Sequence, residues 1–119
     1  DIYADENSIN SLNIPIIKDS FDGINIKLMK CGSLEEGIKM IFLAKKYKLK
    51  IMLGCMVESS VGITAASQIA SLADKIDLDG NLLIKNDPYN GVLINNGNLI
   101  LSEKTGLGLS LKKNIKGLY

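Results

Sequence analysis

Histidine, tryptophan and arginine are absent from the sequence, and aromatic residues make up only 5% of its 119 residues. Without histidine, catalytic triads that use an imidazole base are excluded. The two cysteines, Cys31 and Cys55, do not form a CxxC pair, so a zinc site is not expected either. Two thiols without a recognisable signal peptide indicate a protein of the reducing cytoplasm.

An excess of charge of either sign is also lacking. The sequence has 14 lysines against 13 acidic residues, for a net charge of +1. Proteins that bind nucleic acid usually have a basic excess with arginine or aromatic contacts, so we expect no nucleic-acid partner. No apolar run approaches the roughly 20 residues that span a bilayer, so we expect no membrane span. At 46% hydrophobic and 23% charged residues, the composition is typical of one small globular core.

What the sequence does contain is an alternation of apolar strands and helical segments. Period-two or continuous apolar patterns predict strands, and longer amphipathic stretches predict helices. The predicted strands are residues 2–4, 24–28, 50–54 and 76–79, and the helical segments between them are residues 8–20, 33–48 and 60–73. Connections of this length return each strand parallel to the one before, so the fold class is α/β. The pattern fits either a doubly wound sheet or a barrel.

The clearest helix is the segment 33–48. Ser33 suits the N-cap, and two glutamates follow it at the positive end of the helix dipole. Its predicted apolar side consists of Leu34, Ile38, Ile41, Phe42 and Ala44. The segment 8–20 is less regular, and Pro15 marks the start of its second part.

The pattern changes after Gly80. Residues 91–101 predict a β-hairpin around Asn95-Asn96-Gly97, with alternating apolar residues on both sides. We therefore divide the chain into residues 1–90, which hold the βα units, and residues 91–119, which hold the hairpin and a lysine-rich tail. The first residues read as the interior of a strand, so we expect a further N-terminal portion.

Polar residues share one face of the predicted strands, near the strand ends. In the second strand Lys27 shares a face with Asn25, and in the fourth Asp77 shares a face with Asp79. Asp5 follows the first strand. In a barrel these faces form one interior, and the carboxyl-terminal rim of that interior carries the active site. A lysine buried there is expected to have a lowered pKa, in the range useful for a base.

Each of these residues also has an ordinary structural explanation. An Asp-Glu pair at a strand end is usually a helix N-cap, a strand lysine often guards a sheet edge or reaches to solvent, and Asp-Leu-Asp-Gly is often a turn. Cys55 and Met56 are of types found more often in cores than in sites. The combination favours a site, because these residues recur at the ends of successive strands, one βα unit apart.

Five segments of the chain resemble, in order, barrel strands five to eight of the muconate-lactonizing subgroup of the enolase superfamily. They are Ala4-Asp5-Glu6, Ile24-Asn25-Ile26-Lys27-Leu28, Lys30-Cys31-Gly32, Gly54-Cys55-Met56-Val57-Glu58-Ser59 and Asp77-Leu78-Asp79-Gly80. The Asp-x-Asp pair narrows the resemblance to dipeptide epimerases. The resemblance implies that residues 1–90 form the C-terminal half of a TIM-type (β/α)8 barrel. Residues 91–119 would then pack on the barrel or on its capping domain.

The resemblance implies a role for six residues of this chain. Asp5 would be the last of three carboxylate ligands of a magnesium ion. Lys27 would bind beside the substrate and act as acid and base on one face of its α-carbon. The rest of the substrate pocket would come from four residues, with Asp77 and Asp79 on the α-ammonium group and Cys55 and Met56 along the wall.

The implied reaction is epimerisation at the C-terminal residue of a dipeptide, by 1,1-proton transfer through an enediolate that magnesium stabilises. In the family, a second lysine base, two metal ligands and the capping domain lie outside these segments, so this chain would hold half of an active site. The related N-acylamino-acid racemases, o-succinylbenzoate synthases and muconate cycloisomerases share Asp5 and Lys27, but their substrates offer no α-ammonium group to Asp77 and Asp79.

A different alternative is a non-catalytic half-barrel. Four strands in an arc leave two unpaired edges, through which the chain would associate with its missing half or form a homo-oligomer.

Overall fold

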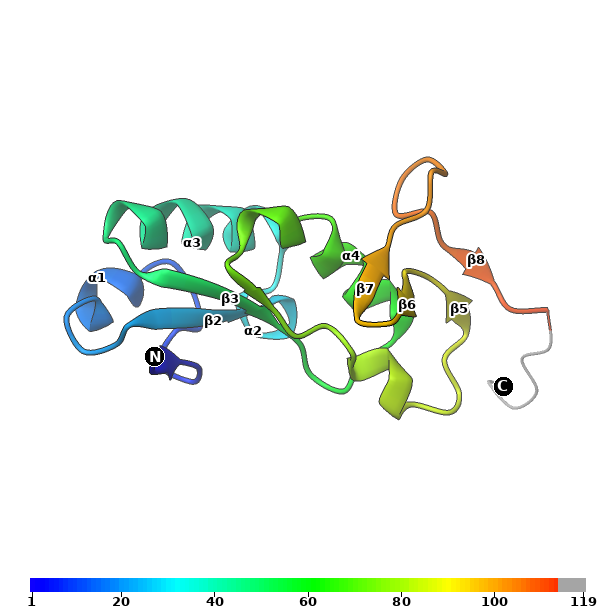
Figure 1. The fold of residues 1–119 in the computed structure, drawn as a ribbon, viewed down its shortest axis with the longest axis horizontal. Coiled ribbons are helices and arrows are strands. Elements are labelled where there is room, and N and C mark those ends of the chain that lie inside the picture. The colour runs from blue at the N-terminus through cyan, green and yellow to red at the C-terminus, as the bar shows by residue number, and fades with distance from the viewer. Residues whose placement is uncertain (114–119) are drawn as a thin grey trace.

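A computed structural model of the chain describes residues 1–113. Its centre is a parallel sheet of four strands in the order β1-β2-β3-β4, which confirms the predicted α/β class (Figure 1). The strands are β1 (Tyr3–Ala4), β2 (Gly23–Lys27), β3 (Lys50–Gly54) and β4 (Lys75–Ile76). Sequential strands are therefore spatial neighbours, as in a barrel wall and unlike an open sheet that reverses its strand order.

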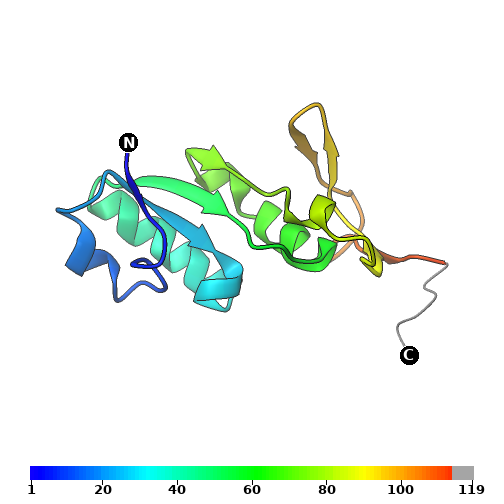
Figure 2. The ribbon, with the colours of Figure 1, turned by 90° about the horizontal axis from the view of Figure 1, so that it is seen from below.

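The central pair is the longest. The strand β2 pairs with β3 over its whole length, from Gly23 opposite Lys50 to Lys27 opposite Gly54. The helices of the crossovers are α1 (Ile14–Ile17), α3 (Leu34–Lys46) and α4 (Ser60–Ser67). Helix α3 runs along one face of β2 and β3, as Figures 1 and 2 show, and leaves the other face for the polar side chains.

Helix α3 begins as its sequence predicts. The Ser33 hydroxyl accepts a hydrogen bond from the Glu36 N–H at 3.0 Å, and acidic residues in the first turn and lysines in the last match the helix dipole. One expectation about this helix is wrong, because Phe42 is 62% exposed. The residues that α3 does bury deeply are Met40, Ile41 and Ala44. Phe42 follows Ile41 directly and is therefore turned to the outer side of the helix.

The core lies between α3 and the sheet. Its inward-facing strand residues are Ile24, Ile26, Ile51 and Leu53, each at most 1% exposed, and Ile14 and Ile63 extend it from the neighbouring helices. β-Branched and aliphatic side chains at every second position fit this buried sheet face. Leu78 continues the apolar row beyond β4, and it is buried while its neighbours in sequence are exposed.

Several predicted boundaries are wrong. Leu28 ends no strand and instead begins the one-turn helix α2 (Leu28–Cys31). Of the segment 8–20 only α1 is helical, with Pro15 in its first turn as expected. The segment 60–73 is not one helix, because α4 ends at Ser67 and a 3₁₀ turn, η1 (Ala70–Leu72), follows. The Ser67 hydroxyl bonds back to the Ile63 carbonyl at 2.8 Å, a contact that competes with the regular ladder.

The fourth strand is shorter than predicted. Only Lys75 and Ile76 pair as a strand, although Asp77 still donates its N–H to the Leu53 carbonyl at 2.9 Å. Within residues 1–113, β4 has a neighbour on one side only, as has β1. An edge strand lacks half of its ladder, so its ends pair less completely.

The C-terminal region contains the predicted hairpin. Strands β6 (Leu93–Asn95) and β7 (Asn98–Ile100) are joined by Asn96 and Gly97, both with positive φ, the type I′ geometry that favours Asn-Gly. A 3₁₀ turn, η2 (Gly80–Leu83), links the sheet to this region. A second antiparallel pair joins β5 (Tyr89–Asn90) to β8 (Ser110–Leu111). The last six residues of the predicted tail lie outside the described residues.

The described chain is elongated, with extents of 49 × 29 × 25 Å, because the hairpin region extends from one end of the sheet (Figure 2). Within residues 1–113 no helix has the length and apolar character needed to cross a membrane.

Candidate active site

The polar residues predicted for the site all lie at the carboxyl ends of the parallel strands. Asp5 directly follows β1, Lys27 ends β2, and Cys55 directly follows β3. Asp77 and Asp79 follow β4. Because the strands are parallel and adjacent, these ends meet along one edge of the sheet. We call this edge, from Asp5 to Asp79, the rim.

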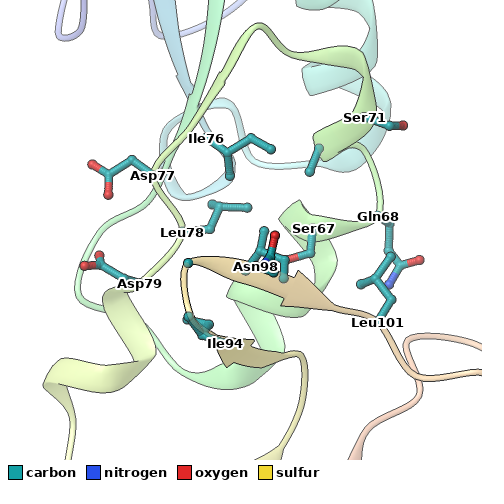
Figure 3. A pocket seen from close by; sticks show the side chains of 13 residues that line it. Ser67, Gln68, Ser71, Ile76, Asp77, Leu78, Asp79, Ile94, Asn98 and Leu101 are labelled. Atoms are coloured by element: carbon teal, nitrogen blue, oxygen red, sulfur yellow. The ribbon is translucent and has the colours of Figure 1, made fainter.

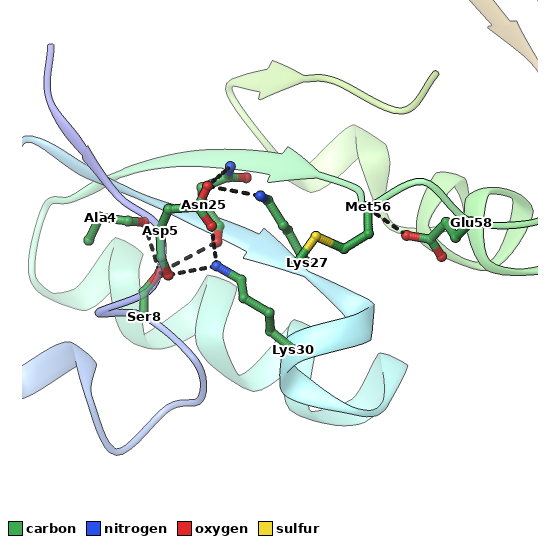
Figure 4. Close-up of polar contacts among 8 residues, drawn as sticks. All are labelled: Ala4, Asp5, Ser8, Asn25, Lys27, Lys30, Met56 and Glu58. Carbon is green, nitrogen blue, oxygen red and sulfur yellow. Dashed lines mark hydrogen bonds and ion pairs between the residues drawn. The ribbon is translucent and has the colours of Figure 1, made fainter. Parts of the chain in front are cut away.

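The first half of the rim is a partly buried ionic cluster around Asp5 (Figure 4). The Lys27 ammonium lies 2.9 Å from Asp5 Oδ2, and the Lys30 ammonium contacts Asp5 Oδ1. Lys30 also donates to the Asp5 main-chain carbonyl at 2.6 Å, and the Asn25 amide donates to Asp5 Oδ2 at 3.2 Å. We call Asp5, Asn25, Lys27 and Lys30 the Asp5 cluster.

A tight turn fixes the position of Asp5. Ser8, which is fully buried, donates its hydroxyl to the Ala4 carbonyl at 2.8 Å and its N–H to the Asp5 carbonyl at 3.0 Å (Figure 4). The Asp5 carboxylate is thereby directed across β2. Short polar side chains that bond to nearby main chain are the usual means of ordering such turns.

The Asp5 cluster is poorly exposed and carries an excess of positive charge. The exposed fractions of the side chains are 14% for Lys27, 11% for Lys30 and 30% for Asp5. Two ammonium groups therefore share one carboxylate. The Oδ1 atom of Asn25 is buried and has no hydrogen-bond partner among residues 1–113. The cluster thus favours a further anionic or polar group beside it.

The pKa values of the cluster follow from these contacts. Burial raises the pKa of Asp5, but its hydrogen bonds and ion pairs with Lys30 and Lys27 outweigh burial and bring it below the ordinary value. The hydrogen bond to Asp5 raises the pKa of Lys27 more than burial lowers it. The expectation that burial lowers the pKa of Lys27 is therefore wrong for this arrangement, because Asp5 stabilises the charged ammonium.

The second half of the rim is more open. The carboxylates of Asp77 and Asp79 are exposed and point to the same side, away from Ile76 and Leu78 (Figure 3). This is the alternation that the sequence predicts. Neither carboxylate has an ion-pair partner within the described part of the chain.

Cys55 lies between the two halves of the rim. Burial raises the pKa of its thiol, and the carboxylates of Asp77 and Asp79 raise it further against the hydrogen bonds from Gly80 and Asp79. The thiol is therefore protonated at neutral pH. Met56, the next residue, is 42% exposed.

A cavity of about 500 Å³ lies on the other side of residues 76–79, between them, the end of α4 and the hairpin. Ile76, Leu78 and Ile94 contribute to its wall, while the carboxylates of Asp77 and Asp79 are turned away from it (Figure 3). This cavity and the rim are therefore on opposite sides of the segment, and the ionisable groups belong to the rim.

A complete metal site is not present within residues 1–113, because no three acidic or thiol side chains converge there. The Asp5 carboxylate is the type of ligand that a hard cation such as magnesium prefers. It fits such an ion as one ligand, and the other ligands have to come from outside the described residues.

Three contributions to this region are missed by the sequence analysis. Lys30 is quoted there only as part of a motif and receives no role. Lys30 lies in the one-turn helix α2, which begins directly after Lys27 at the end of β2, and the sequence predicted a strand there up to Leu28. Asn25 is placed on the correct face without a role. Asp87, buried beyond the rim, accepts the Ser60 N–H at 2.7 Å and so caps α4, and no local pattern indicates that.

Comparison with known proteins agrees with this geometry. The family model described as enolase C-terminal domain-like matches residues 2–115. The chain belongs to this family. A curated relative, the L-Ala-D/L-Glu epimerase of Bacteroides thetaiotaomicron, is 44% identical to this chain over 108 residues. The match covers 91% of this chain and 28% of that protein. The recognition of the family from sequence is confirmed.

Solved structures of the family have the same arrangement. The substrate-liganded L-Ala-D/L-Glu epimerase of Bacillus subtilis superposes with a TM-score of 0.83 at 32% identity, over 90% of this chain and 32% of that one. The dipeptide epimerase of Methylococcus capsulatus, complexed with Mg and the dipeptide L-Arg-D-Lys, superposes with a TM-score of 0.84 at 32% identity, with the same coverage. The chain thus spans about a third of the length of these relatives.

Proposed function

We propose that this chain is the part of a magnesium-dependent dipeptide epimerase that carries one acid–base lysine, one metal ligand and the group that binds the substrate ammonium. The observation that supports this most is the layout of the rim. A partly buried lysine–carboxylate pair lies at its β1–β2 end, and two carboxylates without an ion-pair partner among residues 1–113 lie at its β4 end. A dipeptide has complementary groups at its two ends, a carboxylate and an α-ammonium group.

In this proposal Lys27 exchanges the α-proton of the C-terminal residue on one face of the α-carbon. A proton next to a carboxylate is weakly acidic, so the negative charge that forms on the substrate carboxylate oxygens needs stabilisation. When bound, magnesium supplies Lewis-acid stabilisation of that charge, with Asp5 as one of its ligands. Lys30 and Asn25 hold Asp5 in place. Lys30 also adds a positive charge to the Asp5 cluster, and Asn25 adds a hydrogen-bonding amide.

The second part of the proposal concerns the substrate class. Asp77 and Asp79 bind the α-ammonium group of the dipeptide, while Cys55 and Met56 line the wall between the two ends. Two exposed carboxylates that have no ion-pair partner among residues 1–113 suit a cationic group, whereas a neutral acyl group offers them no charge and an acyl group that ends in a carboxylate would be repelled. This favours a dipeptide over the N-acylated substrates of the related racemases and of o-succinylbenzoate synthase.

The rest of the active site belongs to the longer protein. We propose that residues 1–90 complete an eight-stranded barrel together with a preceding half that provides the second base, the other metal ligands and the capping domain. Residues 91–119 would pack on the barrel or on that domain. The open edges of β1 and β4 are suited to such completion. A cytoplasmic location, inferred from the two thiols, stays a prediction.

The test is α-proton exchange in deuterated water on the full-length protein, with magnesium and a panel of L-Ala-X dipeptides beside their N-acetylated forms. We expect exchange at the α-carbon of X, with epimerisation, for the free dipeptides. Exchange with the N-acetylated compounds alone would transfer the assignment to the acyl-substrate relatives. A folded, magnesium-loaded protein that exchanges neither set would support a non-catalytic barrel.

A further inference from the structure

Glu58 lies beside the rim and has no role in the proposed reaction. It belongs to the short segment that joins β3 to α4, two residues beyond Met56. Its carboxylate accepts the Met56 N–H at 3.1 Å (Figure 4). The segment from Cys55 to Glu58 is thereby bent back on itself, and the acidic side chain bonds to the main chain of a residue that faces the rim.

The position of the Glu58 carboxylate depends on Gly62. A Cβ atom at position 62 would lie 1.9 Å from Glu58 Oε2, so the carboxylate occupies the space that any other side chain would need. Gly62 is in the first turn of α4, where the helix dipole favours a negative charge. A glycine lowers the stability of a helix relative to alanine. The feature of position 62 that requires glycine is therefore the space that the Glu58 carboxylate occupies.

Met56 is also restrained from its other side. A Cβ atom at position 80 would lie 2.0 Å from the Met56 carbonyl oxygen and 3.1 Å from the Cys55 sulfur. The main chain of Met56 is thus in close contact with Gly80, which directly follows Asp79. The Met56 peptide is held between the Glu58 carboxylate and the segment that carries the two rim aspartates.

We propose that Glu58 is a positioning residue that, seated on Gly62, fixes Met56 against Gly80 and so sets the position of the Cys55–Met56 wall of the proposed substrate pocket. This inference rests on the proposed function, because the pocket is that of the dipeptide. Glu58 acts through the main chain of Met56 and contacts neither the substrate nor Lys27. Its loss therefore weakens substrate binding and leaves the proton-transfer step unchanged.

Three variants of the full-length protein test this. In Glu58→Ala the acceptor is lost, and we expect KM for the preferred dipeptide to rise roughly tenfold, the effect of one lost charge-assisted hydrogen bond, with kcat changed less than twofold. In Glu58→Gln the amide oxygen still accepts the Met56 N–H, so KM stays close to that of the wild type. Gly62→Ala displaces the intact carboxylate and is expected to raise KM as Glu58→Ala does, while the melting temperature holds or rises because alanine favours the helix.

Hydrogen exchange of the Met56 amide is the readout that does not depend on activity. We expect faster exchange in Glu58→Ala and Gly62→Ala, and wild-type exchange in Glu58→Gln and in the matched control Glu35→Ala, which removes an exposed glutamate from the first turn of α3. Unchanged Met56 exchange in Glu58→Ala overturns the inference, and so does a fall in kcat at constant KM. If the wild type turned over no dipeptide, the proposed function would fail, and Met56 exchange would still decide whether Glu58 holds this segment.

Discussion

The two halves of the rim position their charged groups in different ways. At the β1–β2 end, Asp5 and Lys27 are partly buried and pair directly, and Lys30 and Asn25 also contact Asp5. At the β4 end, Asp77 and Asp79 are exposed and have no ion pair among residues 1–113. Their segment is instead supported through the main chain, by Gly80 against Met56 and by the Asp87 cap on α4.

This difference matches two different chemical tasks. A group that transfers a proton or holds a metal needs a fixed position, and buried ion pairs with several hydrogen bonds provide it. A group that binds a charged ligand needs oxygen atoms that are free to accept hydrogen bonds from it. Exposed carboxylates keep these oxygen atoms free until the ligand binds. The comparison predicts that substitutions at the first end change the rate and stability, and that those at the second change affinity.

The largest effect is expected for Lys27→Ala in the full-length protein. We expect α-proton exchange on the face served by Lys27 to fall roughly 10²- to 10⁴-fold, the usual contribution of a general acid or base. Exchange is followed by NMR in deuterated water. Lys39→Ala, which removes an exposed lysine paired with Glu36 at 3.9 Å, is the control and should retain full activity. Undiminished exchange in the Lys27 variant would remove this residue from the mechanism.

The next effect concerns the open end of the rim. Replacing both Asp77 and Asp79 by asparagine should raise KM for free dipeptides roughly 10- to 100-fold, because the ammonium group loses its charged partners. KM for an N-acetylated dipeptide should not rise, and this contrast is what steady-state kinetics would measure. Asp19→Asn, which removes one negative charge at an exposed carboxylate paired with Lys18, is the control for a change of surface charge. Equal losses on both substrates would contradict ammonium binding.

Lys30→Met tests whether the Asp5 cluster also supports the fold. The variant keeps the length of the side chain but leaves the Asp5 carbonyl and one carboxylate oxygen without their donor. We expect the free energy of unfolding to fall by about 1.5 kcal/mol, measured by urea denaturation. The Lys18–Asp19 pair offers a comparison, since its carboxylate is 84% exposed and Lys18→Met should change stability by less than about 0.5 kcal/mol. Equal changes in the free energy of unfolding for the two variants would mean that the contacts of Lys30 stabilise the fold no more than those of Lys18.

The smallest effect is expected for Asp87→Asn, which tests the main-chain support of the second half. Burial raises the pKa of Asp87, but hydrogen bonds from Ser60 and Tyr89 and the charge of Lys112 bring it below its ordinary value. A carboxyl group with a lowered folded-state pKa stabilises the protein above its unfolded pKa of about 3.9 and loses that effect as the pH falls through the folded value. The variant should therefore lower the free energy of unfolding by about 1 kcal/mol at pH 7.

The pH dependence distinguishes this cap from a general packing effect. As the pH falls through the folded-state pKa of Asp87, we expect the difference between Asp87→Asn and the wild type to shrink toward zero, since below that pKa the carboxyl group is neutral in both the folded and unfolded states of the wild type. Denaturation curves at pH 7 and at successively lower pH values follow this difference. A difference that is the same at all of these pH values would show that the charge of Asp87 is not what stabilises α4.

Much of the fold could be predicted because it depends on local patterns. The alternation in β2 and the Ser33 cap with its acidic first turn are visible in short stretches of sequence. The Asn-Gly turn of the hairpin is equally local, since it needs positive φ at both central residues. The errors arise where a neighbour decides the outcome. The strand β4 (Lys75–Ile76) is short because it lies at an edge of the described sheet. The error at Phe42 is of another kind, because the turn of the helix between buried Ile41 and exposed Phe42 is itself a local property.

The sequence by itself determined which chemical groups this protein has and on which strand ends they lie. With no histidine in the chain, Lys27, Asp5, Asp77 and Asp79 are the ionisable groups at those ends that alternation directs to one face. Only the tertiary structure decided how these groups pair. The pKa of Lys27 is raised and not lowered because its ammonium lies 2.9 Å from Asp5, which is 22 residues away in the chain. Such distances are set by parallel strand register and crossover packing, which a local pattern does not contain.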